Sequence, residues 1–173
     1  VDNEAGRASG HADVPLSASG RCKAQELGRQ YATEAIDAVF CSDLQRAATT
    51  AELAFAARGL PIIPDARLRE CDYGAMTRCP PAQLDESRHI TQPYPRGESW
   101  HMAVQRVGVF LREISPRYDG RRIVVIGHKA TKYGIDYWCG AISLAEVMGK
   151  PWEWRDIPIW RYELDAHMIE REL

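Results

Sequence analysis

The sequence predicts an α/β fold, a three-layer α/β/α sandwich with a mostly parallel central sheet. Patterns typical of helices and of strands alternate along the chain, and this order favours helices packed on both faces of one sheet. The clearest strand pattern is Ile123–Ile126, whose adjacent β-branched residues indicate burial on both faces. A length of 173 residues, with no repeat and no linker, predicts a single domain over residues 1–173.

The first part of the chain predicts two helices, a strand between them and an extended segment after them. Apolar residues at helical spacing indicate the helices, and short apolar runs indicate the strand. In chain order we expect a helix from Leu16 to about Ala35, a strand over Ala38–Cys41, a helix from Leu44 to about Ala57 and an extended segment over Pro61–Pro64. Ser17 or Ser19 is the expected N-cap of the first helix, and Ser42 or Asp43 that of the second, which Gly59 ends.

The second part of the chain begins with an irregular stretch, from Asp65 to Gly97, and then returns to regular patterns. Prolines interrupt this stretch, which is either a lid over a site or a loose surface loop. In chain order we expect a short helix around Ala82 to Arg88, a helix opened by Ser99, a strand over Arg122–Gly127, a helix from about Lys129 to Cys139, a capping box at Ser143–Glu146 and a final strand through Trp160, Tyr162 and Leu164.

The composition argues against several classes of protein. With 22 Lys and Arg against 24 Asp and Glu, the chain lacks the basic excess of a nucleic-acid-binding protein. No apolar run is long enough to cross a bilayer, so no membrane partner is expected. The five widely spaced cysteines indicate reduced thiols in a cytoplasmic protein, and neither a metal nor another cofactor is expected. Trp152, Trp154 and Trp160 either cover the core or form a dimer surface, which leaves a homodimer open.

Two strand-to-helix junctions are the candidate ligand site, because open α/β sheets bind ligands beyond the carboxyl ends of their strands. The first junction carries Arg46 in the opening turn of a helix, and the second carries His128 at the end of the best strand. With the N–H groups of the two helix starts, these side chains predict a phosphate-sized anion site. The alternatives are a surface or ion-paired Arg46 and a hydrogen-bonded core histidine at position 128.

Glu70 is a third candidate, in an apparently compact turn over Leu68–Gly74. It is either a general acid held near the anion site or a solvated loop carboxylate. The remaining histidines lie in polar or loop contexts, and structural roles are expected for them. They are His11, His89, His101 and His167.

Five segments, taken in order, resemble the motifs of one known family. They are Gly10–Ser17, Ser42–Ala47, Leu68–Gly74, Pro95–Ser99 and Ile123–His128. Together they resemble the histidine phosphatase superfamily, whose members share the phosphoglycerate-mutase-like fold. The resemblance covers most of the chain and implies the same three-layer sandwich. The alternative is an unrelated small α/β protein with chance matches.

One departure from the family concerns the nucleophile. In the family, Arg-His-Gly or Arg-His-Ala at the end of the first strand supplies the histidine that takes the phosphoryl group. Neither tripeptide occurs in this sequence. By the family's spacing, Asn3 matches an asparagine that follows the signature by a few residues. We therefore expect the nucleophile just upstream of Val1, in a longer protein of which this chain is a part.

The resemblance implies a phosphomonoesterase that acts on a small phosphorylated metabolite through a phosphohistidine. Arg46 and His128 would stabilise the phosphoryl oxygens, and Glu70 would protonate the leaving alcohol and then activate water. Further contacts with the substrate, or with inorganic phosphate, are expected from Asn3, Ser9, Gly10, Tyr73 and Lys129. Lys129 indicates a second anionic group on the substrate, or it is a solvated lysine at a helix start.

The stretch from Ala47 to Arg96 is short for a mutase of this family, because mutases carry a longer insertion there. A phosphatase is therefore favoured. The alternative within the same fold is a catalytically inactive module that binds a phospho-ligand or a protein partner.

Overall fold

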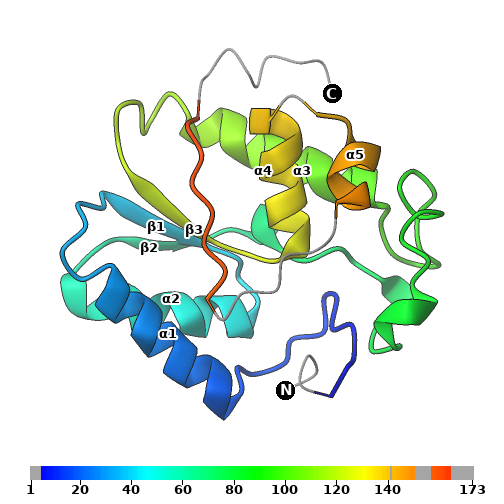
Figure 1. Cartoon of the computed structure of the whole chain (residues 1–173), viewed down its shortest axis with the longest axis horizontal. Coiled ribbons are helices and arrows are strands. Elements are labelled where there is room, and N and C mark those ends of the chain that lie inside the picture. Colours follow the sequence, from blue (N-terminus) through cyan, green and yellow to red (C-terminus); the bar gives the residue numbers. More distant parts are fainter. Residues whose placement is uncertain (1–4, 141, 151–156, 165–173) are drawn as a thin grey trace.

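The computed structural model describes residues 5–140, 142–150 and 157–164, and a parallel sheet lies at its centre (Figure 1). The strands are β1 (Ala38–Cys41), β2 (Ile62–Pro64) and β3 (Ile123–Ile126). Their order is β2-β1-β3, and both pairings are parallel, with Val39 opposite Ile62 on one side and Val124 on the other. The predicted parallel sheet is confirmed.

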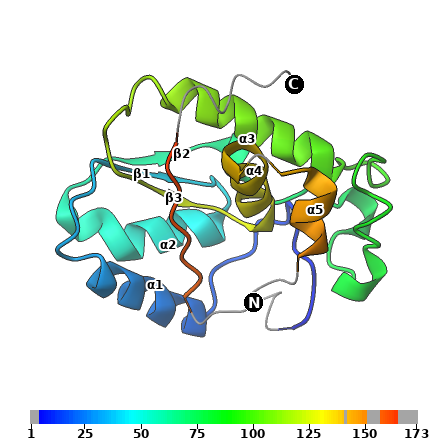
Figure 2. The same cartoon turned by 45° about the horizontal axis from the view of Figure 1, so that its top comes forward.

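Helices cover both faces of this sheet, which confirms the predicted three-layer sandwich. They are α1 (Ala18–Gln30), α2 (Gln45–Phe55), α3 (Trp100–Ile114), α4 (Lys129–Gly140) and α5 (Leu144–Gly149). Helices α1 and α2 lie below the sheet, and α3 and α4 lie above it (Figures 1 and 2). Short 3-10 turns occupy Ala56–Arg58, Ala66–Leu68, Gly74–Met76 and Pro81–Gln83. No helix in the described ranges is both long and apolar enough to span a membrane.

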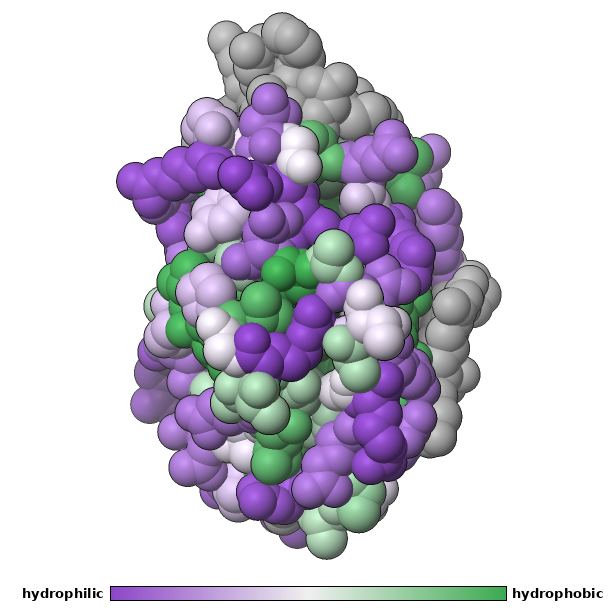
Figure 3. Space-filling model, turned by 90° about the vertical axis from the view of Figure 1, so that its left-hand side faces the viewer, coloured by the Kyte–Doolittle hydropathy of each residue, from purple (hydrophilic) through white to green (hydrophobic). Residues whose placement is uncertain are grey.

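The strand side chains alternate between two apolar cores, as the period of a β-strand requires. Phe40 points to the core under α3, where its ring meets Phe110 and Tyr118 edge-on at centroid distances of 5.2 and 5.3 Å. Val39 and Cys41 point to the opposite core, against α2. The side of the molecule where the strands begin shows apolar side chains within a ring of hydrophilic ones (Figure 3).

Several predicted caps are confirmed. Ser17 Oγ accepts a hydrogen bond from the Gly20 N–H at 3.1 Å, and Ser99 Oγ accepts one from Met102 at 3.2 Å. Ser143 and Glu146 form the predicted capping box of α5. These residues fix where α1, α3 and α5 begin.

The cap of α2 differs from the prediction of Ser42 or Asp43. The N–H of Gln45, in the first turn, donates instead to Asp13 Oδ1 at 2.7 Å. Asp43 is unavailable because both its oxygens accept from Arg69, at 2.7 and 2.6 Å. A distant carboxylate therefore takes the position that a local one was expected to fill.

Two predicted helices are shorter than expected. Helix α1 ends at Gln30 and not near Ala35, because Arg58 donates to the carbonyls of Tyr31 and Glu34 at 2.8 and 2.6 Å and holds them in a turn. The helix expected around Ala82 to Arg88 is reduced to the 3-10 turn over Pro81–Gln83. Asp85 has a left-handed backbone, with φ of 41°, which interrupts any helix there.

Two strand predictions are corrected as well. The side chains of β3 are only half-buried, because β3 lies at an edge and has no second strand partner among the described residues. The final strand expected through Trp160, Tyr162 and Leu164 does not form within residues 157–164. That segment packs through side chains instead, with the Tyr162 hydroxyl donating to Asp136 Oδ1 at 2.6 Å.

Close packing of α3 on α4 depends on Gly108. A Cβ at this position would overlap the Trp138 indole, which is buried and fixed by a 2.9 Å hydrogen bond from Nε1 to the Val104 carbonyl. We expect Gly108→Ala to lower the free energy of unfolding by about 1–3 kcal/mol in urea denaturation. Gly149→Ala is the control, because an added Cβ there meets nothing within 4 Å. Equal stability of the two variants would contradict this account of the packing.

Candidate active site

The candidate site lies beyond the carboxyl ends of the strands. The chain before α1 and the stretch between β2 and α3 both run along this side, to the right of the sheet in Figure 1. Helices α2 and α4 begin here, immediately after β1 and β3. The topology therefore brings the sequence-predicted Arg46, Glu70 and His128 to one region of the fold.

Arg46 lies in the first turn of α2 and reaches across to the segment that precedes α1. Its Nη1 donates to the Ala12 carbonyl at 3.0 Å, and its Nη2 donates to the Gly10 carbonyl at 2.9 Å. Both contacts join residues more than thirty positions apart in the sequence. Arg46 thus positions a positive charge at the site and also fixes the loop around Gly10.

His128 follows β3 directly, and its Nε2 is buried with no hydrogen-bond partner among the described residues. A buried ring nitrogen left in this way is costly unless a ligand completes its bonding. Burial, followed by the positive charges of Arg46, Arg106 and His11, holds the pKa of His128 well below its ordinary value. Arg46, Arg106 and His11 therefore all act electrostatically on the His128 ring.

Glu70 belongs to the stretch between β2 and α3, and its carboxylate reaches the start of α4. Its Oε1 accepts from the backbone N–H of Cys71 at 2.9 Å and of Ala130 at 3.0 Å, and its Oε2 faces the Lys129 N–H at 3.3 Å. The helix start expected to bind an anion thus holds this carboxylate, as the start of α2 holds Asp13. The Glu70 side chain is held in a fixed orientation, unlike that of a solvated loop residue.

His11, for which a structural role was expected, contacts the Glu70 turn. Its Nε2 lies 2.7 Å from the Glu70 carbonyl oxygen and 3.9 Å from Glu98 Oε1. Its Nδ1 lies 3.7 Å from Asp72 Oδ2. All these partners are about sixty or more residues away in the sequence, so no local pattern could have indicated them. The one available signal was its position inside the Gly10–Ser17 motif.

Arg106, from α3, fixes the Glu70 turn and was not among the sequence candidates. It donates to the carbonyls of Arg67, Arg69 and Glu70 at 2.7 to 2.8 Å. It also binds Glu98 Oε1 at 2.6 Å. A single helical side chain therefore ties the Glu70 turn to the Pro95–Ser99 segment.

Two glycines allow these same segments to pack directly on one another. Gly74 has a φ of 49°, and a Cβ there would collide with the Pro95 carbonyl. A Cβ at Gly97 would collide with the Asp72 carbonyl. Backbone hydrogen bonds join the pair, from Ala75 to Pro95 at 2.8 Å and from Glu98 to Asp72 at 3.0 Å.

The other predicted contact residues occupy different positions. Ser9 is buried beside Gly10, whose φ is 50°. The Tyr73 ring lies in the core, edge-on to Tyr94 at a centroid distance of 5.2 Å. The same ring packs closely against Gly10. Asn3 lies outside the described residues, as do His167, Trp152 and Trp154. Burial, followed by the negative charge of Glu70, raises the pKa of Tyr73 well above its ordinary value.

Lys129 is held by an ion pair and by aromatic rings. Its Nζ donates to both carboxylate oxygens of Glu86, at 2.8 and 2.7 Å. Burial is the largest single influence and opposes the charge, but the hydrogen bonds that Lys129 donates to Glu86, the charge of Glu86 and the Tyr133 hydroxyl together raise the pKa of Lys129. The solvated helix-start lysine considered from the sequence is therefore not what the structure contains.

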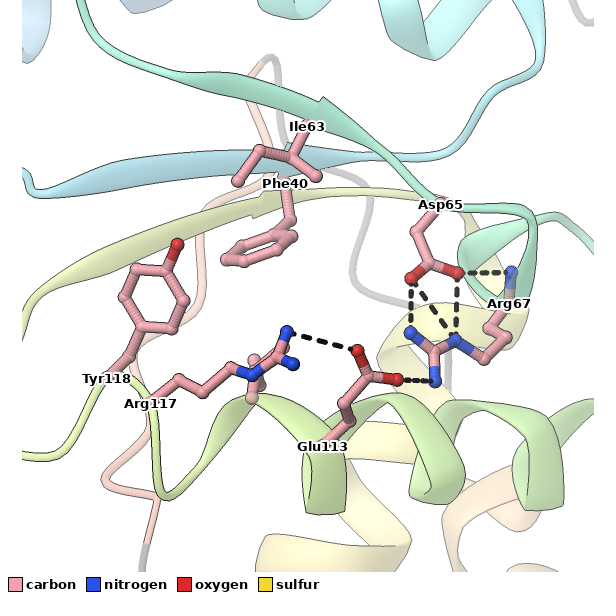
Figure 4. A pocket seen from close by; sticks show the side chains of 8 residues that line it. Phe40, Ile63, Asp65, Arg67, Glu113, Arg117 and Tyr118 are labelled. Atoms are coloured by element: carbon pink, nitrogen blue, oxygen red, sulfur yellow. Dashed lines mark hydrogen bonds and ion pairs between the residues drawn. The ribbon is translucent and has the colours of Figure 1, made fainter.

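A cavity of about 360 Å³ lies apart from these residues, between the sheet and the end of α3 (Figure 4). Phe40 and Ile63 form its apolar side. Its charged side chains pair with one another, because Arg67 binds Asp65 and Glu113, each at 2.6 Å. None of the sequence-predicted site residues lines it. In the described ranges, no cluster of His, Cys, Asp or Glu side chains could hold a metal ion.

The fold is that of an α/β protein with basic side chains beyond the carboxyl ends of its strands, and comparison with known proteins gives its family. The chain matches the family model of the histidine phosphatase superfamily, branch 1, over residues 1–145. It belongs to that superfamily, which confirms the resemblance inferred from the five motifs.

Individual relatives carry both mutase and phosphatase names. The protein named Probable phosphoglycerate mutase GpmB from Klebsiella pneumoniae is 37% identical over 94 residues, covering 54% of this chain and 40% of that protein. Phosphoserine phosphatase 1 from Hydrogenobacter thermophilus is 29% identical over 136 residues, covering 73% of this chain and 64% of that protein. The chain spans less than two thirds of the length of either relative.

A solved structure shows the same fold. The structure of YhfR from Bacillus stearothermophilus superposes with a TM-score of 0.76 at 27% sequence identity. The match covers 89% of this chain and 81% of that chain.

Proposed function

We propose that the protein is a phosphomonoesterase that hydrolyses a small phosphorylated metabolite through a phosphohistidine intermediate. The observation that carries the proposal is the buried His128 Nε2, which has no hydrogen-bond partner in the described part of the chain. The nearby positive charge of Arg46 acts on the same ring. A phosphoryl oxygen would complete its hydrogen bonding and would balance the surrounding positive charge.

Each residue has a defined part in the proposed reaction. In the first step a histidine nitrogen attacks phosphorus, the P–N bond forms, and the P–O bond to the alcohol breaks. Arg46 and His128 stabilise the equatorial oxygens, and Glu70 gives its proton to the leaving alcohol. In the second step Glu70 takes a proton from water, the water oxygen attacks phosphorus, and the P–N bond breaks.

The nucleophile is proposed to come from residues preceding Val1. The edge of β3 supports this, because β3 pairs with no second strand in the part of the chain that the structure describes, and a further parallel strand there would end beside His128. Half-burial of all the β3 side chains is consistent with a missing neighbour. Asn3, Ser9 and Gly10 would then follow that strand around the phosphoryl group.

The alternative is an inactive module that binds a phospho-ligand. It is favoured by one observation, that no Arg-His-Gly or Arg-His-Ala occurs within the 173 residues. Such a module would keep Arg46 and His128 but would form no covalent intermediate.

Trapping the intermediate distinguishes the two proposals. The natural protein is incubated with ³²P-labelled small phosphomonoesters, such as phosphoserine and phosphoglycerate, and then denatured in alkali. We expect label on one histidine, stable in alkali and released by acid, within a peptide that precedes Val1. Phosphate binding without any labelled histidine or released phosphate would favour the inactive module.

A further inference from the structure

Lys129 lies at the boundary of the proposed phosphoryl site. It follows His128 directly, and its backbone N–H faces Glu70 Oε2 at 3.3 Å. Burial raises the pKa of the Tyr133 hydroxyl, and the charges of Lys129, Glu86 and Glu70 all act on it. Lys129 thus contacts Tyr133 and Glu86 through its side chain and Glu70 through its backbone.

The ammonium group of Lys129 is held in place before any substrate binds. Its Nζ lies 5.5 Å from the centroid of the Trp100 ring and 5.3 Å from that of Tyr133. Both rings attract the cation through their faces, and both are buried. Only 26% of the Lys129 side chain is exposed, unlike that of a solvated surface lysine. The conformational entropy of this long side chain is thus already lost on folding, and substrate binding does not have to order it again.

Glu86 reaches this cation from the irregular stretch between β2 and α3. Leu84 and Tyr94 anchor the stretch in the core on either side of it. Asp85, immediately before Glu86, is one of the few non-glycine residues with a left-handed backbone. Such a conformation costs about 1 kcal/mol or more and persists where the surroundings impose it. The chain is thus bent locally just before its carboxylate meets Lys129.

We propose that Glu86 occupies, on Lys129, the position of a carboxylate that belongs to the substrate. The substrate class is then a phosphomonoester with a carboxylate close to its phosphate, and the inference rests on the proposed function. Substrate binding would displace Glu86, whose side chain is 28% exposed and can return to water. Lys129 selects the carboxylate, and Glu86 competes with that carboxylate for the same ammonium group.

Non-hydrolysable phosphonates test this inference whether or not the protein is catalytically active. Phosphonoacetate is compared with ethylphosphonate, and 3-phosphonopropionate with propylphosphonate, by calorimetric titration of the natural protein. Within each pair a carboxylate replaces a methyl group. For at least one pair we expect the carboxylate to bind about tenfold more tightly, equivalent to about 1.4 kcal/mol. Lys129→Met should reduce that ratio to near one.

Glu86→Gln is the matched variant for the displacement step. It removes the competing charge, so we expect a several-fold gain in carboxylate affinity and no change for the alkylphosphonates. A ratio near one for both pairs in the unaltered protein would overturn the inference, as would a ratio that persists in Lys129→Met. If Lys129→Met does not fold, Lys129→Gln serves in its place. Failure of every phosphonate to bind would instead overturn the proposed phosphate site itself.

Discussion

Replacing His128 by alanine in the natural protein is expected to lower kcat for phosphomonoester hydrolysis by about 100- to 1,000-fold, the usual effect of losing one donor to a developing charge. The reason is the buried Nε2, which has no hydrogen-bond partner among the described residues and is poised for a phosphoryl oxygen. The measurement is the steady-state release of phosphate. His128→Gln, which keeps an N–H donor, should recover part of the loss.

His101→Ala is the control for this experiment. His101 is exposed on α3 and contacts Gln105, so its removal should leave kcat unchanged. A His128→Ala protein that folds normally and works at full rate would be incompatible with the proposed mechanism.

Glu70→Gln is expected to lower kcat for alkyl phosphates by about 100-fold or more, because a poor leaving group needs a proton as it departs. For p-nitrophenyl phosphate, whose leaving group needs little help, the first step should be much less affected. A burst of p-nitrophenol followed by slow turnover is therefore expected, since Glu70 also activates water in the second step. Stopped-flow absorbance measures both phases.

Glu70 also accepts hydrogen bonds from the start of α4, so its substitution has a structural component. That component would slow the first step equally for both substrates, and an equal loss in the first step would therefore contradict the role as proton donor. Glu113→Gln is the matched control. Glu113 lies in the separate cavity under α3, and its loss should alter neither phase.

Strand positions and helix caps could be predicted from the sequence, because they depend on neighbouring residues. Ala38–Cys41 and the Ser17 and Ser99 caps lie where the local pattern placed them, because neighbouring residues decide such features. The edge position of β3 could not be predicted, since burial of a strand depends on how many partners the sheet supplies.

The parts of the site that escaped prediction depend on contacts between distant segments. Arg106 looks like any polar position of an amphipathic helix until three carbonyls of the Glu70 turn converge on it. Asp43 appeared to be a helix cap, but Arg69 gives it two charge-assisted hydrogen bonds. In both cases the stronger partner comes from another part of the chain, and tertiary contact overrides local preference.

The direct packing of Gly74 on Pro95 and of Gly97 on Asp72 has an evolutionary consequence. The stretch between these glycines leaves and re-enters the fold at a single fastened point. Outside its buried anchors Leu84 and Tyr94, its length can therefore vary at little entropic cost and without moving Glu70. We therefore expect substrate preference to vary with this stretch, while the residues proposed for phosphoryl transfer stay in place.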